Sequence, residues 1–223
     1  MNKTQMILMS AIVAGAQTAS ADERGWYGSL NLGFAIPGGD LVHDDSNTDR
    51  GPEYDLDNGG VAGLGGGYRF GNGLRLEGEL RYRAFDAGGT SGGGLAPPSY
   101  ADGSVTSTTL MTNLAYDFIL KSTKLRPYLK GGIGASWNEA EADVLGVGRS
   151  NRWARYPSET DTQFAWSLGA GFAYPIDERL SLTAEYQYVD LGSGKTGADI
   201  NGHRMDYDDL ASNEITLGLR YAF

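Results

Sequence analysis

The sequence contains no cysteine and only two histidines, His43 and His203. Without cysteine the chain can form no disulfide and offers no thiol nucleophile or thiolate metal ligand. A Ser/His triad or a zinc site would have to use one of the two histidines, and both lie in segments expected to be loops. We therefore predict no catalytic activity, no metal ion and no cofactor.

Long hydrophobic runs are also missing after the first 21 residues. A transmembrane helix needs about eighteen consecutive apolar residues, so any membrane crossing must be made of strands. Basic residues are scarce as well, since 18 lysines and arginines stand against 28 acidic residues, for a formal net charge of −10. An acidic chain without a basic cluster binds nucleic acid poorly, so we expect no nucleic-acid partner.

The first segment has the features of a secretory signal peptide. Lys3 precedes an apolar run over residues 6–16, and small residues follow at 19–21. This order of positive charge, apolar run and small residues predicts cleavage after residue 21. We expect residues 1–21 to be a signal peptide and residues 22–223 to form one outer-membrane β-barrel domain.

The carboxyl-terminal residues alternate between apolar and polar side chains with a period of two. The apolar series is Ile215, Leu217, Leu219, Tyr221 and Phe223. Such a pattern is typical of an outer-membrane β-barrel strand that has one face toward lipid. Earlier segments repeat it, and the full set of predicted strands is about 26–36, 59–70, 74–83, 104–119, 125–137, 160–175, 180–188 and 214–223.

The connections between these strands alternate between short and long. Tight links are expected at about 71–73, 121–124 and 176–179, and long loops rich in Gly, Asp, Asn and Ser at about 37–57, 87–103, 139–159 and 191–209. Outer-membrane barrels have short periplasmic turns and long external loops. The sequence thus predicts an all-β, eight-stranded, antiparallel, up-and-down transmembrane β-barrel in the outer membrane, with both termini in the periplasm.

Aromatic residues lie near the ends of the predicted strands. We expect them to form the two interfacial girdles of a membrane barrel, because they share the lipid-facing phase. Ordinary aromatic enrichment in β-sheets is the alternative. The residues are Trp26, Tyr68, Phe70, Tyr82, Tyr116, Phe118, Trp137, Tyr174, Tyr188, Tyr221 and Phe223.

The polar face of the strands carries charges that the barrel would enclose. An eight-stranded barrel is narrow enough for side chains to fill, so we expect ion pairs across the lumen with water in the gaps. Glu185 and Glu214 are expected to reach Arg220 because their strands are neighbours. The predicted charge network is Arg75, Glu77, Glu79, Arg81, Arg83, Lys130, Glu185, Glu214 and Arg220.

Glycines share this inward phase at several positions. They leave room for long Arg and Glu side chains or, alternatively, open a narrow water path, and we favour the first interpretation because small barrels are filled by their own side chains. These glycines are Gly63, Gly65, Gly67, Gly132, Gly134, Gly169 and Gly171.

Four segments resemble the small outer-membrane β-barrel domain shared by OmpA-type barrels and opacity-type surface antigens of Gram-negative bacteria. They are WYG at 26–28, PYLKGGIG at 127–134, LSLTAEYQY at 180–188 and LGLRYAF at 217–223. The resemblance covers essentially the whole mature chain, although the long loops carry no family signature. It implies that the barrel assembly machinery reads the terminal aromatics, Tyr221 and Phe223. Many OmpA-type proteins continue into a peptidoglycan-binding domain, which this sequence lacks, so we expect no tethering role.

The acidic loops could suggest a calcium site. Residues 45–49 resemble the start of a calcium loop, but Arg50 and Leu56 occupy the positions that require Gly and Glu. We expect these loops to stay solvated. The alternative is loose divalent-ion bridging between loop aspartates and lipopolysaccharide phosphates, through Asp44, Asp45, Asp206, Asp208 and Asp209.

The expected function is that of a structural surface protein whose external loops contact host surfaces, phage or lipopolysaccharide. A narrow, porin-like diffusion channel is the first alternative, and the inward glycines motivate it. A lipid A-modifying barrel enzyme is a weaker alternative. It needs a His and a Ser at the lipid-facing outer rim, and neither His43 nor His203 lies on a predicted strand. A soluble lipocalin-like barrel is a further alternative. It would place the charges of residues 74–83 outside and the aromatic side chains in the centre, which weakens it. Expected partners are outer-membrane lipid, lipopolysaccharide and the barrel assembly machinery, and the chain is expected to be a monomer.

Overall fold

The computed structural model describes residues 24–38, 42–44, 57–91, 99–120, 123–146, 152–195, 205–207 and 210–223. The predicted signal peptide at 1–21, the calcium-like segment at 45–49 and His203 lie outside the described residues. Within the described ranges, no helix has the length and apolar character that crossing a membrane requires.

Eight strands form a closed barrel in which every neighbouring pair is antiparallel, so the predicted eight-stranded, antiparallel fold is confirmed. The first and last strands pair with each other, with Leu30 opposite Leu219, and this pairing closes the wall. Closure leaves the membrane-level wall without a free edge. The order around the barrel is β1 (Gly25–Pro37), β11 (Ala211–Ala222), β8 (Leu180–Asp190), β7 (Arg152–Pro175), β6 (Arg126–Gly146), β5 (Ser99–Asp117), β4 (Leu74–Ser91) and β3 (Gly59–Arg69).

The two faces of the wall have opposite chemistry. Apolar side chains point outward, with Trp26 65% and Phe34 73% exposed, while Arg81 and Arg83 are fully buried inside. An apolar outer belt of this extent is stable only against lipid or another apolar surface. The barrel is therefore inverted relative to a soluble lipocalin-like barrel, and that alternative is wrong.

Short turns lie together at one end of the barrel, called here the turn end. Between β3 and β4 the turn uses Gly71 and Gly73 with φ of 77° and 88°, a backbone conformation that glycine adopts without strain. Between β7 and β8, the carboxylate of Asp177 accepts hydrogen bonds from the backbone N–H groups of Arg179 at 2.8 Å and Leu180 at 2.7 Å. The predicted tight links at 71–73 and 176–179 are thus confirmed.

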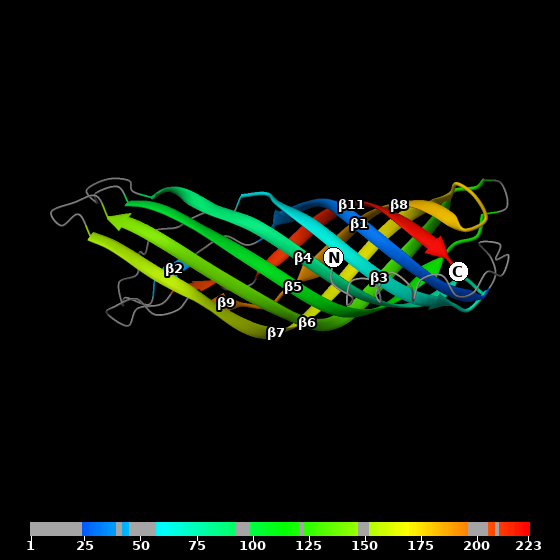
Figure 1. Cartoon of the computed structure of the whole chain (residues 1–223), viewed down its shortest axis with the longest axis horizontal. Coiled ribbons are helices and arrows are strands. Elements are labelled where there is room, and N and C mark those ends of the chain that lie inside the picture. Colours follow the sequence, from blue (N-terminus) through cyan, green and yellow to red (C-terminus); the bar gives the residue numbers. More distant parts are fainter. Residues whose placement is uncertain are drawn as a thin grey trace, which may run out of the picture.

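The chain also ends at the turn end, where the label C stands in Figure 1. The backbone N–H of Phe223 donates to the carbonyl of Trp26 at 3.1 Å, so the last residue is joined to the start of β1. By the rule that outer-membrane barrels have short turns on the periplasmic side, this end faces the periplasm.

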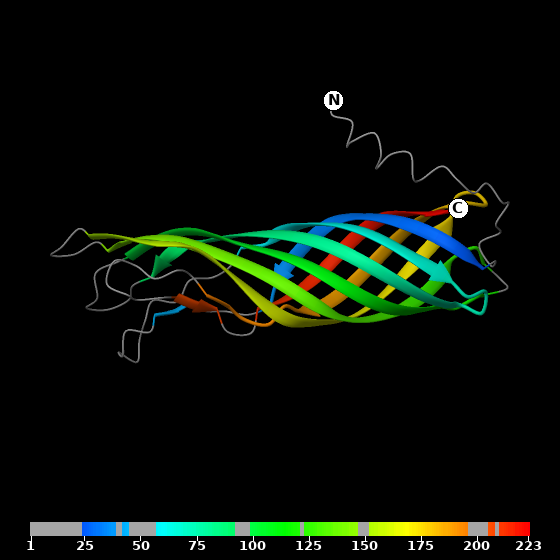
Figure 2. The same cartoon turned by 60° about the horizontal axis from the view of Figure 1, so that its bottom comes forward.

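Four neighbouring strands run far past the opposite end of the barrel, as Figures 1 and 2 show. β4, β5, β6 and β7 contain 18, 19, 21 and 24 residues, whereas β1, β3, β8 and β11 contain 11 to 13. A strand needs only about 9–11 residues to cross a bilayer. We call the excess length of these four strands the projection; it comprises residues 87–91, 99–103, 141–146 and 152–157.

The expectation of loops at 87–103 and 139–159 is therefore wrong for residues 87–91, 99–103, 139–146 and 152–159, and residues 92–98 and 147–151 lie outside the described residues. The β4–β5 ladder continues to Ser91 opposite Ser99, and the β6–β7 ladder continues to Gly146 opposite Arg152, with one register shift between Ala140 and Ala142. Gly, Ser and Asp weaken a strand but do not end it when a neighbouring strand still pairs with its backbone. The amino-acid composition of these segments therefore predicted loops where the chain forms paired strands.

The other two expected loops contain short strands. β2 (Val42–Asp44), β10 (Met205–Tyr207) and β9 (Gly194–Lys195) form a small sheet in the order β2-β10-β9. In the register, Asp206 lies opposite His43 on one side and Lys195 on the other. The segments that follow β1 and β8 are thus joined to each other beyond the barrel.

Candidate functional site

Side chains fill the lumen in three successive layers, which we name from the turn end toward the projection. The turn-end layer contains Tyr27, Arg69, Arg75, Glu77, Asp117, Tyr128 and Arg220. The central cluster contains Glu79, Arg81, Arg83, Lys130, Glu185 and Glu214. The apolar cap contains Ala35, Val61, Phe85, Val105, Ala140, Val189, Leu191 and Leu210, all buried. All nine residues of the predicted charge network are buried, in the first two layers.

Arg81 is the hub of the central cluster. Its Nε, Nη2 and Nη1 lie 2.8, 2.6 and 2.7 Å from carboxylate oxygens of Glu79, Glu185 and Glu214, which belong to three different strands. Lys130 extends the cluster, with its Nζ 2.6 Å from Glu185 and 3.2 Å from Glu79. Ion pairs this short are charge-assisted hydrogen bonds, and they connect opposite walls of the barrel.

The central cluster is electrically balanced, because Arg83 also pairs with Glu214 and brings the count to three cations and three carboxylates. Neutral groups satisfy remaining carboxylate oxygens: Asn113 donates to Glu79 at 2.8 Å and Tyr128 donates to Glu185 at 3.0 Å. The balanced charge and the added hydrogen bonds offset the free-energy cost of removing these charged groups from water.

The turn-end layer is built around two tyrosines. Arg75 donates to the Tyr27 hydroxyl at 3.0 Å, and that hydroxyl donates to Glu77 at 2.8 Å. The same guanidinium has its Nε 2.9 Å from the carboxylate of Asp117. Tyr27 and Asp117 were not among the predicted network residues.

The expected pairing of Glu185 and Glu214 with Arg220 is wrong. Both carboxylates pair instead with residues of the central cluster, and Arg220 lies over the rings of Tyr27 and Tyr128, 5.5 and 5.3 Å from their centres. The distance explains the error, because Arg220 is opposite Ser181 in the register, four residues before Glu185. Four residues span about 13 Å along a strand, which is beyond direct contact.

The apolar cap closes the lumen below the projection, and the segment after β8 contributes to it. Leu191 is completely buried there, and its carbonyl accepts hydrogen bonds from Ser136 Oγ at 2.6 Å and Asn138 Nδ2 at 2.8 Å. Ser107 Oγ donates to the side-chain oxygen of Asn138 at 2.8 Å. The two bonds from β6 hold the start of the β8–β11 connection inside the barrel mouth, and Ser107 of β5 fixes the orientation of Asn138.

The inward glycines make room for large side chains. A Cβ on Gly171 would lie 2.5 Å from Tyr128 Cζ, and one on Gly67 would lie 2.7 Å from the Tyr27 hydroxyl. A Cβ on Gly63 would lie 3.0 Å from Arg81 Cγ. These contacts favour steric relief over a water path. An inward tyrosine opposite an inward glycine was the available sequence signal for the turn-end layer.

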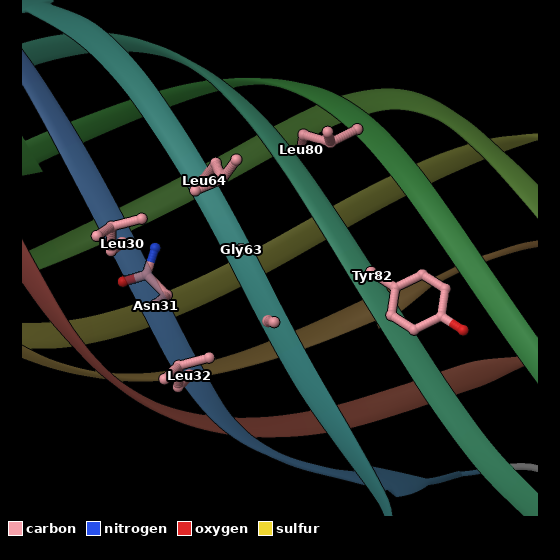
Figure 3. Close-up of a pocket in the computed structure, with 8 residues that line it drawn as sticks. Leu30, Asn31, Leu32, Gly63, Leu64, Leu80 and Tyr82 are labelled. Atoms are coloured by element: carbon pink, nitrogen blue, oxygen red, sulfur yellow. The ribbon is translucent and has the colours of Figure 1, made fainter. Parts of the chain in front are cut away.

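The outer wall has a hollow of about 320 Å³ over β1, β3 and β4 (Figure 3). Ala62 lies between Leu32 and Tyr82 in the register, and its short side chain leaves the hollow beside the row of Leu30, Leu64 and Leu80. Apart from Asn31, the lining residues are apolar or aromatic, so the hollow belongs to the lipid-facing wall. Its residues are Leu30, Asn31, Leu32, Ala62, Gly63, Leu64, Leu80 and Tyr82.

Aromatic side chains surround the turn end on the outside. Trp26 and Tyr68 pack edge to face with ring centres 5.2 Å apart, and Tyr116 and Phe118 do so at 5.1 Å. Tyr221 and Phe223 form a similar pair at 5.7 Å. This arrangement agrees with one of the two predicted aromatic girdles, the one at the turn end. Recognition of the terminal pair by the assembly machinery stays a prediction.

Metal ligands do not gather within the described ranges, where no three His, Cys, Asp or Glu side chains form a metal-binding group. The side chains of His43, Asp44 and Asp206, and residues 45, 203, 208 and 209, are outside what the structure describes. Divalent-ion bridging by the loop aspartates therefore stays a prediction.

Comparison with known proteins identifies the family. The family described as "Outer membrane protein beta-barrel domain" matches residues 6–223. The chain belongs to this family. It is therefore an outer-membrane β-barrel protein, as the alternating strands and the apolar outer wall predicted.

Named relatives of this outer-membrane protein have the same location. Outer membrane protein PagN of Salmonella typhimurium is 32% identical over 126 residues, which cover 53% of this chain and 51% of PagN. The 31 kDa outer-membrane immunogenic protein of Brucella melitensis is 28% identical over 210 residues, covering 89% of this chain and 83% of that protein. The aligned part of this chain thus spans about half the length of PagN.

Solved structures share the fold. OprG from Pseudomonas aeruginosa superposes with a TM-score of 0.55 at 18% identity, covering 93% of this chain and 99% of OprG. Neisserial surface protein A superposes with a TM-score of 0.50 at 21% identity, covering 90% of this chain and 99% of that chain. At these identities the likeness concerns the fold alone.

Proposed function

We propose that this outer-membrane protein is a structural surface protein that holds the projection outside the cell, where it contacts host surfaces, phage or lipopolysaccharide. The observation that carries the proposal is the length of β6 and β7, 21 and 24 residues, about twice what a bilayer requires. Paired strands carry the projection well beyond the lipid-covered part of the wall. Loops on a rigid scaffold are favourable positions for recognition.

The filled lumen supports a structural role over a narrow diffusion channel. The central cluster and the apolar cap block it in series, and side chains of Arg81, Tyr27 and Tyr128 fill the space beside Gly63, Gly67 and Gly171. We expect the folded protein to give no single-channel conductance in a planar bilayer. Reproducible, voltage-stable conductance steps from verified folded barrels would favour the channel instead.

Surface exposure of the projection can be tested by labelling, because the chain has no cysteine of its own. A single cysteine is introduced by S91C at the end of β4 or, as the control, by N72C in the turn between β3 and β4. A membrane-impermeant maleimide applied to intact cells is expected to label S91C alone. Labelling of N72C on intact cells would reverse the proposed orientation.

The contact role needs a second experiment. Residues 87–103 and 141–157 are replaced by two-residue turns, which remove the projection and keep the membrane-level strands. Cells of a non-adherent Gram-negative host that produce the full chain are expected to adhere to epithelial monolayers more than cells that produce the shortened barrel at equal surface level. Equal adherence would remove the support for a host-contact role.

Further support for a surface role comes from the relative of Brucella melitensis, which is named as an outer-membrane immunogenic protein. We propose outer-membrane lipid, lipopolysaccharide and the barrel assembly machinery as partners, and a monomer as the assembly. The lipid A-modifying alternative needs a histidine at the outer rim. The His43 side chain and His203 lie outside what the structure describes, so that alternative gains no support.

A further inference from the structure

The hollow in the outer wall lies over β3, whose outward residues are small at this level. Gly60 and Ala62 are successive outward residues of β3, and neither carries more than one methyl group. The flanking strands carry large side chains, and Leu32 of β1 and Tyr82 of β4 are 68% and 51% exposed on either side of the hollow (Figure 3). Leu64 bounds the hollow toward the turn end. The hollow is thus a recess between strands with longer side chains.

The fold does not require a small residue at Gly60. A Cβ added there would have no other heavy atom within 4 Å, and Gly60 is not among the described glycines with positive φ. Glycine weakens a strand, and where it occurs in one it often marks the close approach of a ligand. Packing within the chain therefore does not explain why this side chain is missing.

The hollow lies at the level of the lipid hydrocarbon, past its midplane from the periplasmic side. Ala62 is six residues along β3 from Tyr68, which belongs to the turn-end girdle. Six residues of a strand tilted by about 45° rise about 14 Å, and the apolar band of an outer-membrane barrel is about 25 Å tall. Asp86 is exposed four residues after Tyr82 on β4, so the wall becomes polar again there. The hollow therefore opens toward the outer leaflet.

A hydrocarbon chain is the occupant that matches this recess. The volume is about 320 Å³, and Asn31, which also lines it, directs its amide nitrogen to Glu79 in the lumen at 3.5 Å. An apolar surface without neighbouring atoms loses its dispersion contacts, and a flexible acyl chain restores them. A second copy of the chain fits less well, because membrane-embedded surfaces approach each other closely through small residues, and here the small residues are recessed behind large ones.

The level of the hollow identifies the source of the hydrocarbon. In the outer leaflet of the outer membrane, the acyl chains belong to lipopolysaccharide. We propose that the hollow binds one acyl chain of the lipid A part of lipopolysaccharide. The site gives the lipopolysaccharide contact proposed above a position on the wall and rests on that part of the proposed function. It does not rest on the contact role of the projection, so the two can fail separately.

Retention of purified lipid A by the folded full chain tests the site. The protein in a zwitterionic detergent is mixed with excess lipid A, isolated through an affinity tag, and its bound lipid A is counted by mass spectrometry. Magnesium chloride is present because the lipid A phosphates would otherwise be repelled by Asp86. We expect one lipid A per wild-type chain and at least fivefold less retention by A62L, whose leucine fills the hollow. A170L is the matched control, because Ala170 is an exposed residue of β7, four strands away from β3 in either direction around the barrel.

Several outcomes would overturn the proposal. Absence of retained lipid A in the wild type would do so, as would equal retention by A62L and the wild type. If A62L fails to fold by circular dichroism, G60V decides, because its side chain enters open space at the outer end of the hollow, and retention equal to the wild type then refutes the site.

The identity of the occupant is tested in the same assay. Equal retention of phosphatidylethanolamine in place of lipid A would refute lipid A as the ligand, and a wild-type dimer that is lost in A62L would assign the hollow to a second copy. The shortened barrel without the projection keeps this wall and is expected to retain lipid A like the full chain. Loss of retention by the shortened barrel would assign the binding to the projection instead.

Discussion

Replacing Arg81 by glutamine is expected to destabilise the barrel strongly. The substitution removes three contacts of 2.6 to 2.8 Å and leaves the carboxylates of Glu79, Glu185 and Glu214 with only two cations, Lys130 and Arg83. Removing one partner of a buried ion pair typically costs about 3–5 kcal/mol, because the remaining charge stays buried. We expect the free energy of unfolding of R81Q to fall by about this amount.

Urea unfolding in phosphatidylcholine vesicles, followed by tryptophan fluorescence, measures the effect. The double variant R81Q/E79Q restores the charge balance and is expected to be more stable than R81Q, with a coupling energy of about 1–3 kcal/mol. K124Q is the control, because Lys124 is exposed and outside the lumen. An R81Q stability within about 0.5 kcal/mol of the wild type, as for a surface substitution, would refute the assigned role of the central cluster.

Three further predictions use other parts of the molecule. G171A places a methyl group against Tyr128 and is expected to cost about 1–3 kcal/mol in urea unfolding, whereas G131A, whose added Cβ has no neighbour within 3.7 Å, should be neutral. L217R introduces a charge on the lipid face, where the wild-type side chain is 63% exposed, and is expected to cost about 2–4 kcal/mol; equal stability in vesicles would contradict a lipid-facing wall. Backbone N–H donors hold the pKa of Asp177 below its ordinary value, so its ionised form stabilises the turn above about pH 4. The stability difference between wild type and D177N should therefore shrink as pH falls through that lowered pKa, and a pH-independent difference would contradict this.

Much of the wall was predictable because a strand has a simple period. Successive side chains point to opposite faces, so Leu217 outward and Arg81 inward follow from their neighbours in the sequence alone. The turns were readable for a similar reason, since glycine at 71 and 73 marks a backbone conformation that other residues avoid. Neither inference needs knowledge of a distant strand.

The projection shows where local reasoning fails. Segments 87–91 and 99–103 are rich in Gly, Ser, Ala and Asp and were expected to be loops. They are strands because each has a paired neighbour, with Ala87 opposite Gly103 and Gly89 opposite Ala101. Strand pairing depends on backbone hydrogen bonds between segments, and composition does not report them.

Which residues meet across the lumen depended on closure of the barrel. The alternating pattern placed Arg81, Glu214 and Arg220 on the inner face, and that part of the interpretation holds. It could not show that Arg81 contacts Glu214, 133 residues away, while Arg220 lies with the tyrosines. The period of two sets the face of each residue, but the relative heights of residues on different strands depend on how far the strands are staggered when the barrel closes. That stagger exists only in the folded sheet, so the ion pairs and the tyrosine–arginine layer could be known only from the tertiary structure.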